Sequence, residues 1–441
     1  MKIRIFFETW SAIIIEEDET PKLNKLKIAF LTYRGNMRCG GQGIYSWYLV
    51  QELKKLGHDI TVISGPPYID PLEQVEVKKL SSMYDVYDRR LPRPLSRLLN
   101  PLNFWEWVQI ITKGFPEPFT FTLRTYLYLR KRLKHGDFDL VHDNQSLGYG
   151  LLFLRRWVPV TATVHHPMHV DREAALKQAR SRREIIKKRR FYGFISMQDR
   201  VIRRLDGLVT VSQAAKEANV TAYRIPEKSM TVIYNGVDTD VFRPLNLERE
   251  DNRLLLVTNT EDRKKGVLYL LQAMVKLPPE VKLTIVDEVK PRNYAYVLRE
   301  EMGLRERVTF TGRLTIEDLV KQYNTASVVV VPSVYEGFGL PAAEASACAT
   351  PVIATSGGAL PEVIADGESG LVVPPMDPEA LAEAIRSLLS NPDLRERMGN
   401  KGRERIQHLF TWQKSAKEHT AYFLEVINEY SRLQAVRHKR G

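Results

Sequence analysis

The sequence predicts an α/β protein with two doubly wound domains. Its 441 residues exceed the size at which a single hydrophobic core usually stops growing, so two domains are expected. Short β-branched runs alternate with segments whose apolar residues recur at helical spacing, which is typical of parallel sheets covered by helices. A polar, irregular stretch after Asn235-Gly236 places the junction between the domains at about residues 240–250.

The first strand, turn and helix follow one another at short intervals. Residues 26–33 form an apolar run suited to a buried parallel strand, and the glycine-rich segment RGNMRCGGQG follows directly. Apolar residues from Ile44 to Leu56 then recur at helical spacing, and residues 59–64 form the second strand. Such a turn can present backbone N–H groups to a phosphate at the start of a helix.

Part of this turn matches a dinucleotide-binding fingerprint. Gly41 and Gly43 occupy the places of its first two glycines, but Ser46 replaces the third. The second strand ends in Ser64-Gly65, without the acid that would hold a ribose. A nicotinamide-dependent oxidoreductase that uses NAD stays an alternative on this partial match, and a tight turn without a ligand is another.

Two histidines follow a later strand of the first half. Strands are expected at residues 139–142, 158–164, 208–212 and 230–236. His165 and His166 come directly after the second of these, and ligands in open α/β sheets bind just outside the carboxyl ends of strands. His165 is therefore a candidate site residue, although a lone histidine is more often structural.

The second half repeats the alternation of strands and helices. The expected strands lie at residues 253–258, 281–287, 307–312, 328–331, 351–355 and 369–375, and the expected helices at residues 267–275, 316–326, 378–389 and 409–430.

The stretch from residue 326 to residue 345, ASVVVVPSVYEGFGLPAAEA, dominates this half. Its strand stops at Pro332, and a helix is expected to begin near Pro341, because proline at the first helical position costs no hydrogen bond. Gly337 and Gly339 allow the backbone of the turn to approach a ligand closely. The free N–H groups at the start of the helix then predict a phosphate site.

Two glutamates bracket this turn. Glu336 and Glu344 lie eight positions apart, and each ionised carboxylate can accept hydrogen bonds from two hydroxyl groups. Two carboxylates beside an anion site indicate a ligand with both phosphate and sugar hydroxyls. The alternative is that Glu344 only complements a helix dipole and Glu336 is a solvated loop charge.

The segment YEGFGLPAAEA resembles the paired-glutamate signature of family-4 glycosyltransferases. These are retaining enzymes of the GT-B fold, in which two doubly wound Rossmann-like domains face a cleft. The resemblance runs from about Lys27 to about Tyr430 and is strongest between Thr309 and Pro375. It implies a hexosyltransferase that moves a sugar from a nucleotide-diphosphate sugar to an unidentified acceptor, with neither a cofactor nor a metal.

The resemblance also implies a division of the chain. The expected units are an N-terminal extension at 1–24, an acceptor-side domain at 25–244, a nucleotide-sugar-binding domain at 245–412, and a helix at 413–441 that packs back toward the first domain.

Individual roles follow from the same resemblance. It implies that Glu344 binds the ribose hydroxyls and that Glu336 binds the sugar. The backbone N–H groups of Phe338 and Gly339 would also bind the sugar, and that of Leu340 would bind the phosphates.

Basic residues of the loop NTEDRKKG are expected to neutralise the negative charge of the donor diphosphate. Lys265 resembles the lysine of the family's loop, whereas the place of its arginine falls at Asn259 or Thr260, so Arg263 is expected to supply that charge from a shifted position.

In the first domain, the resemblance places His165 near the donor sugar and Gly41 against the donor pyrophosphate. The expected catalytic residues are Glu336, His165 and Lys265.

The formal charge of +12 is concentrated in two segments. Residues 89–135 and residues 179–204 each hold ten Lys or Arg and two acids, so the rest of the chain is slightly acidic. The first segment also contains many aromatic residues, a combination that suits the interface of an anionic membrane. The alternative is an aromatic core with a solvated basic face. Nucleic acid is not an expected partner, because no recognised nucleic-acid motif accompanies the charge.

A non-catalytic protein that binds anions or a membrane surface would need only these two basic segments and stays an alternative. The expected location is the cytoplasm, with peripheral contact to the inner face of the membrane. Cys39 and Cys348 lie in different predicted domains, which does not favour a disulfide framework. No apolar run is long enough to span a bilayer, and residues 1–24 lack the pattern of a secretory signal. The Asp-x-Asp triplets at 137–139 and 238–240 are short matches, so no metal is assigned to them.

Overall fold

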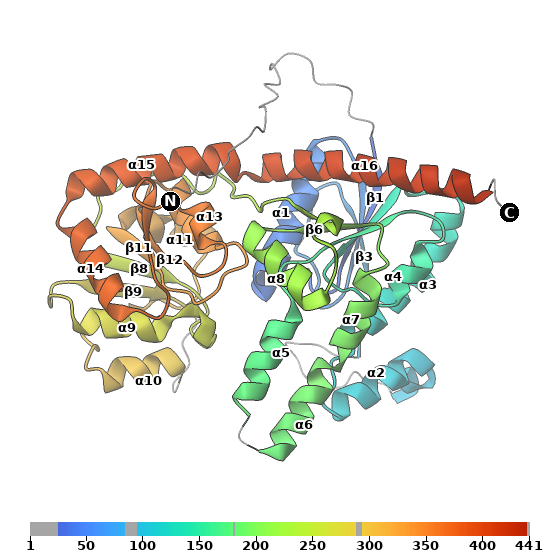
Figure 1. Cartoon of the computed structure of the whole chain (residues 1–441), viewed down its shortest axis with the longest axis horizontal. Helices are drawn as coiled ribbons and strands as arrows, with labels where there is room; N and C mark the ends of the chain where they lie inside the picture. The colour runs from blue at the N-terminus through green and yellow to red at the C-terminus, as the bar shows by residue number, and fades with distance from the viewer. Residues whose placement is uncertain (1–24, 84–94, 180, 288–292, 439–441) are drawn as a thin grey trace, which may run out of the picture.

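The computed structural model describes residues 25–83, 95–179, 181–287 and 293–438. It shows two parallel β-sheets side by side, each surrounded by helices (Figure 1). All the named strands pair in parallel with their neighbours. The predicted architecture of two doubly wound α/β halves is therefore confirmed.

The first sheet has seven strands in the order β3-β2-β1-β4-β5-β6-β7. Its strands are β1 (Lys27–Thr32), β2 (Asp59–Ser64), β3 (Glu76–Lys79), β4 (Leu140–Asn144), β5 (Val160–Thr163), β6 (Gly207–Thr210) and β7 (Met230–Val232). The helices that accompany it are α1 (Gly41–Lys55), α2 (Pro101–Ile111), α3 (Glu117–Lys134), α4 (Gly150–Leu154), α5 (Met168–Lys177), α6 (Arg182–Phe191), α7 (Ile195–Ile202) and α8 (Gln213–Tyr223).

The second sheet has six strands in the order β10-β9-β8-β11-β12-β13. Its strands are β8 (Arg253–Val257), β9 (Lys282–Val286), β10 (Val308–Phe310), β11 (Val328–Val331), β12 (Val352–Thr355) and β13 (Gly370–Val373). Its helices are α9 (Val267–Val275), α10 (Tyr294–Glu301), α11 (Ile316–Thr325), α12 (Leu340–Ala347), α13 (Leu360–Val363), α14 (Pro378–Leu389) and α15 (Pro392–Leu409), and α16 (Trp412–His438) follows them.

Both faces of the second sheet are packed against apolar side chains, which explains why its strands are continuously hydrophobic. In β11, Val329 and Val331 belong to one core cluster, whereas Val328 and Val330 belong to the cluster on the opposite face. All four side chains are buried. Because side chains alternate across a strand, a run of four valines supplies both cores at once.

Helices α15 and α16 run along one edge of the molecule, α15 over the second sheet and α16 over the first (Figure 1). Helix α16 contributes Trp412 and Phe423 to a core cluster of the first half. The Trp412 ring stacks on Tyr48 of α1, with 5.5 Å between ring centroids. The chain thus returns from the second sheet to the first through a packed helix.

Helix α1 begins at Gly41, three residues before the start that apolar spacing predicts. Its first turn consists of Gly41, Gln42 and Gly43. None of these has a large apolar side chain, so the spacing of apolar residues does not predict this turn. Gly43 is required for packing, because a Cβ atom there would lie 2.0 Å from the carbonyl oxygen of Asn36. One of the two glycines that resemble a dinucleotide fingerprint therefore serves the fold.

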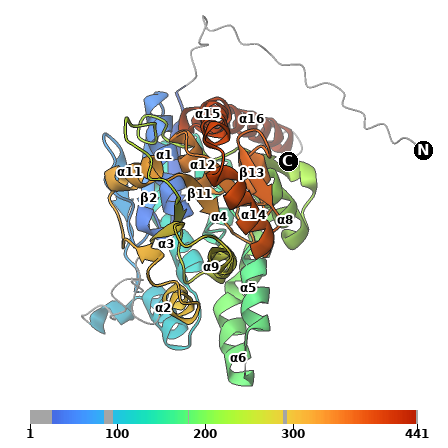
Figure 2. The same cartoon turned by 90° about the vertical axis from the view of Figure 1, so that its left-hand side faces the viewer.

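The basic run at 179–204 divides into two parts. Helix α6 has no buried residue. Helix α7 differs, because Ile195, Val201 and Ile202 are buried on one of its faces. Helices α5 and α6 project from the body of the molecule in both views (Figures 1 and 2). In the described ranges, no helix has the length and hydropathy needed to cross a bilayer.

The expected domain limits at residues 24, 244 and 412 stay a prediction. The extension at 1–24 and the end of the chain at 439–441 lie outside the described residues.

Candidate active site

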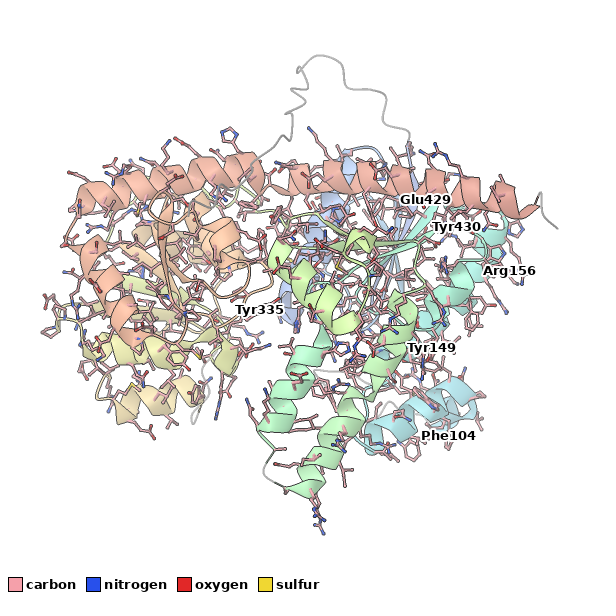
Figure 3. All side chains as sticks on the ribbon, in the orientation of Figure 1. Phe104, Tyr149, Arg156, Tyr335, Glu429 and Tyr430 are labelled. Atoms are coloured by element: carbon pink, nitrogen blue, oxygen red, sulfur yellow. The ribbon has the colours of Figure 1, made fainter. Side chains whose placement is uncertain are left out.

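A cavity of about 640 Å³ lies between the two halves of the molecule, at the carboxyl ends of strands from both sheets. Figure 3 shows Tyr335, one of its lining residues, in the region between the two sheets. Among the residues predicted from the sequence, the lining includes Gly41, His165, Lys265, Glu336, Phe338, Gly339, Leu340 and Glu344. Arg263 is not among the lining residues.

The turn between β11 and α12 supplies much of the cavity wall. Gly339 precedes the helix with φ of 96°, a left-handed conformation that favours glycine. A Cβ atom at this position would also lie 2.7 Å from the Leu360 side chain. Helix α12 begins at Leu340, within one residue of the predicted start, and Gly339 and Leu340 line the cavity. This arrangement suits an anionic group.

Glu336 and Lys265 form an ion pair at the cavity. The Lys265 Nζ lies 2.8 Å and 2.9 Å from the two carboxylate oxygens of Glu336. The hydroxyl of Ser333 donates a further hydrogen bond to this carboxylate, at 2.8 Å. The ammonium of Lys265 and the carboxylate of Glu336 are thus held together at the cavity. A ligand could contact the ammonium through its phosphates and the carboxylate through its hydroxyls.

Close packing of two loops brings this pair together. Gly266 has φ of 69°, and a Cβ atom there would lie 1.9 Å from the carbonyl oxygen of Pro332. The backbone N–H of Val334 donates to the carbonyl of Lys264 at 2.7 Å. The loop that carries Lys265 is therefore fixed against the loop that carries Glu336.

Glu344 lies on the first turns of α12 and lines the same cavity. The hydroxyl of Tyr323 donates a hydrogen bond to its carboxylate at 2.8 Å. Burial raises the pKa of Glu344 to about 7, although the hydrogen bond from Tyr323 acts in the opposite direction. Glu344 is thus a hydroxyl acceptor whose charge is poised near neutral pH.

His165 is held as a neutral hydrogen-bond acceptor. Its Nε2 lies 2.7 Å from the Oδ1 of Asn144, and the amide group of Asn144 donates to the Ser46 hydroxyl and the Gln42 carbonyl. An amide oxygen can only accept, so Nε2 carries the hydrogen and Nδ1 has a free lone pair. Burial lowers the pKa of His165 to about 3, so the ring stays neutral at ordinary pH.

Gln145 orients the backbone around the two histidines, a role that the sequence did not reveal. Its side chain accepts from the N–H of His165 at 2.7 Å and donates to the carbonyl of His166 at 2.6 Å. The residue itself has φ of 55°, a strained conformation that often marks a functional site. The one sequence feature that could have indicated this role is its position directly after β4, at the carboxyl end of a strand.

Lys264, rather than Arg263, lies at the cavity. Its ammonium pairs with Asp171 of the other half at 2.7 Å, and Asp171 also contacts His166 at 2.8 Å. The Arg263 side chain is instead exposed, with its guanidinium carbon 4.9 Å from the centre of the Tyr294 ring. Its role in binding the donor stays a prediction that this placement does not favour.

Within the part of the chain that the structure describes, no three His, Cys, Asp or Glu side chains come together in a way that could hold a metal ion.

Two family models match the chain. One, described as Glycosyltransferase Family 4, covers residues 39–241, and the other, described as Glycosyl transferases group 1, covers residues 238–405. The boundary between the matched regions falls close to the junction that the sequence predicts.

Curated relatives extend the similarity to nearly the whole chain. An "MMP alpha-(1->4)-mannosyltransferase" of Mycolicibacterium hassiacum is 40% identical over 411 residues, covering 91% of this chain and 98% of the relative. A D-inositol 3-phosphate glycosyltransferase of a Mycobacterium species is 32% identical over 59% of this chain and 62% of the relative.

Solved structures share the fold. A sucrose-phosphate synthase of Thermosynechococcus elongatus aligns with a TM-score of 0.71 and 26% identity, covering 92% of this chain and all of that one. The Anabaena protein HepE, solved with UDP and glucose, aligns with a TM-score of 0.65 and 16% identity over 90% of this chain and 99% of that one.

The raised pKa of Glu344 predicts a pH-dependent stability. The unfolded chain releases this proton near pH 4.5, whereas the folded chain holds it to about pH 7, so the free energy of unfolding falls as pH rises between these values. The full difference is on the order of 3 kcal/mol. Glu344→Gln keeps an oxygen for Tyr323 and removes the titration, so the variant should exceed the parent in stability at pH 8 and lose that advantage at pH 4.5. Urea unfolding at the two pH values measures this, and a pH-independent difference would contradict it.

Proposed function

Because the chain belongs to glycosyltransferase family 4, we propose that it transfers mannose, with retention and without a metal, from a nucleotide-diphosphate mannose to an acceptor hydroxyl. That it is a nucleotide-sugar glycosyltransferase of the GT-B fold follows from the family, as the sequence predicted. The choice of mannose rests on one observation, the 40% identity with a mannosyltransferase over 98% of that protein.

The cavity offers different groups to the two ends of such a donor. Glu344, half-buried on α12, would accept hydrogen bonds from the ribose hydroxyls. The start of α12 and the Lys265 ammonium would bind the diphosphate, as the positive end of a helix and a cation favour anions. Glu336 would then turn from Lys265 to the hydroxyls of the sugar. Each end of the donor thus replaces a contact that the protein already makes.

The same groups would stabilise the transition state. Sugar transfer breaks the bond between the anomeric carbon and the phosphate oxygen, so positive charge grows on the ring and negative charge on the departing diphosphate. Fixed donors aimed at such growing charge are typically worth about 3 kcal/mol each. We assign this role to Lys265 and the N–H groups of the turn, which line the cavity, and propose that they serve instead of a metal.

Retention is proposed through attack on the face that the diphosphate leaves. The acceptor oxygen bonds to the anomeric carbon, and its proton passes to the departing phosphate oxygen, so no protein base is needed. The neutral His165 fits this scheme, because a ring with a pKa of about 3 accepts a hydroxyl hydrogen bond but removes a proton poorly. We therefore assign His165 to orienting a sugar hydroxyl.

The two alternative classes lose support. An NAD-dependent oxidoreductase would use Gly43, which instead packs against Asn36. A non-catalytic anion-binding protein gives no reason for Glu336 and Glu344 to share a cavity with Lys265.

The proposed reaction predicts a selective donor. In a thermal-shift panel of uridine, guanosine and adenosine diphosphate sugars, one mannose donor should raise the Tm most, because a ligand of the native state stabilises it. Proton NMR of the first product should show the anomeric configuration of the donor. Turnover of a different sugar would refute the choice of mannose, and an inverted product would refute retention.

Two single substitutions should separate binding from chemistry. Lys265→Ala should lower kcat about a hundredfold, since it removes a donor to the leaving diphosphate. Glu344→Ala should raise the donor Kd about tenfold with a smaller change in kcat. Lys276→Ala, on the outer end of α9, is the matched control and should change neither. Unchanged kinetics in both site variants would remove the assigned roles.

We further propose that the first half of the molecule rests on an anionic membrane surface at the inner face of the cytoplasmic membrane. Helices α2, α5 and α6 lie on the side of the molecule away from α16 (Figure 1), and Figure 3 labels Phe104 on α2. Exposed apolar side chains occur on these helices and on the turn before α2, namely Leu99, Phe104, Trp105, Ile111, Val170, Ile186 and Phe191. The two basic segments also meet, since Arg190 donates to the Thr112 hydroxyl at 2.6 Å. Apolar and cationic side chains on one face are typical of interfacial binding.

This surface predicts charge-dependent binding to vesicles. The protein should cosediment with phosphatidylserine vesicles at low salt and much less with phosphatidylcholine vesicles or at high salt. The double variant K187E and R189E should reduce binding. The matched double variant K417E and R432E, on α16 at the opposite edge (Figure 1), should leave it unchanged. Failure of the parent protein to cosediment would refute the membrane proposal.

A further inference from the structure

The first turn of α8 in the first half reaches the second half of the molecule. Ser212, the N-cap residue of α8, accepts a hydrogen bond from the N–H of Ala215 at 3.0 Å. Its hydroxyl also donates to the carbonyl of Gly337 at 2.6 Å. The cap of this helix is therefore bonded directly to the turn beside Glu336.

The carboxylate of Glu362, on α13, completes this contact from the other side. One of its oxygens accepts from the N–H of Gln213 at 2.8 Å, and the other accepts from the N–H of Ala214 at 2.8 Å. The hydroxyl of Tyr234 donates a third hydrogen bond to it, at 2.9 Å. Three donors of the first half thus converge on one anion of the second, at the positive end of an eleven-residue helix.

The segment that carries Glu362 is also tied to the backbone of Glu336. The N–H of Ala359 donates to the Glu336 carbonyl at 2.9 Å, and the N–H of Glu336 donates to the Gly357 carbonyl at 3.3 Å. Gly358 has φ of 65°, and a Cβ atom there would lie 2.2 Å from the Glu336 carbonyl oxygen. A displacement of α13 would therefore be transmitted to Glu336 through its main chain.

We propose that Glu362 is a positioning residue that clasps the first turn of α8 and thereby holds the turn at Glu336 and Gly337 in its reactive place. The donor contacts expected of Glu344 and Lys265 come from the second half alone and do not require the clasp. The placement of that turn opposite His165 depends on contacts between the two halves, because His165 belongs to the first half, and the three hydrogen bonds to Glu362 are the largest group of these contacts described here. Loss of the clasp should therefore impair turnover more than nucleotide binding.

Glu362→Gln tests the clasp with little change in size. A neutral amide has one oxygen, and its NH₂ group would face a backbone N–H, so at least one of the three donors loses its partner. The matched control is Glu383→Gln, an exposed glutamate on α14 of the same half. Tyr234→Phe removes only one of the three donors and should have an intermediate effect.

The first readout is the split between turnover and nucleotide affinity. For the donor that the thermal panel selects, release of nucleoside diphosphate with water as the acceptor should be about ten- to a hundredfold slower in the Glu362→Gln variant. The Kd of the free nucleoside diphosphate should change less than about twofold. The control variant should match the parent in both. Unchanged turnover, or an equal loss of nucleotide affinity, would overturn the proposal.

The second readout does not depend on activity. Hydrogen–deuterium exchange should be faster in the variant at the first turn of α8 and in the turn at 333–339, while the central strands keep their protection. Unchanged exchange at both places would overturn the clasp even if turnover fell. If the parent itself binds no nucleoside diphosphate, the proposed function fails, whereas the exchange test of the clasp still stands.

Discussion

The ion pair between Lys265 and Glu336 is the contact on which the rest of the site depends. Strands β8 and β11 are neighbours in the second sheet, so the loops at their carboxyl ends lie together. Gly266 then allows these loops to touch, and the ammonium and the carboxylate meet at 2.8 Å. The pair places opposite charges in the wall of the cavity where we propose that the donor binds. The pairing of β8 with β11 therefore brings the Lys265 ammonium and the Glu336 carboxylate together.

The first half of the molecule contributes shape and neutral acceptors more than charge. His165 is kept uncharged by burial, and its tautomer is set by Asn144. Contacts from Lys264 to Asp171 and from α8 to Glu362 join the two halves. The second half supplies Lys265, Glu336 and Glu344 to the cavity, and the first half supplies His165.

Most strands of the two sheets could be predicted from the sequence, whereas the edge strand β3 and the contacts that support the candidate site could not. The limits of β2 and β11 match the predicted residues, because a buried parallel strand leaves a simple apolar signature. Tyr323 and Glu362 escaped notice since they act on partners 21 to 149 positions away. The resemblance suggests Arg263 only as a shifted replacement for the family's arginine, and in the structure its guanidinium lies over the Tyr294 ring. The start of α1 was missed because glycines carry no apolar signal.

The most direct test is a crystal structure of the protein with an intact nucleotide-diphosphate sugar. We expect the Glu344 carboxylate within hydrogen-bond distance of the ribose hydroxyls and the Lys265 ammonium on the diphosphate. The Glu336 carboxylate should then have left Lys265 for a hydroxyl of the sugar. A donor bound outside the cavity, or one that leaves the Lys265–Glu336 pair intact and Glu344 without a ribose contact, would contradict this description of the site.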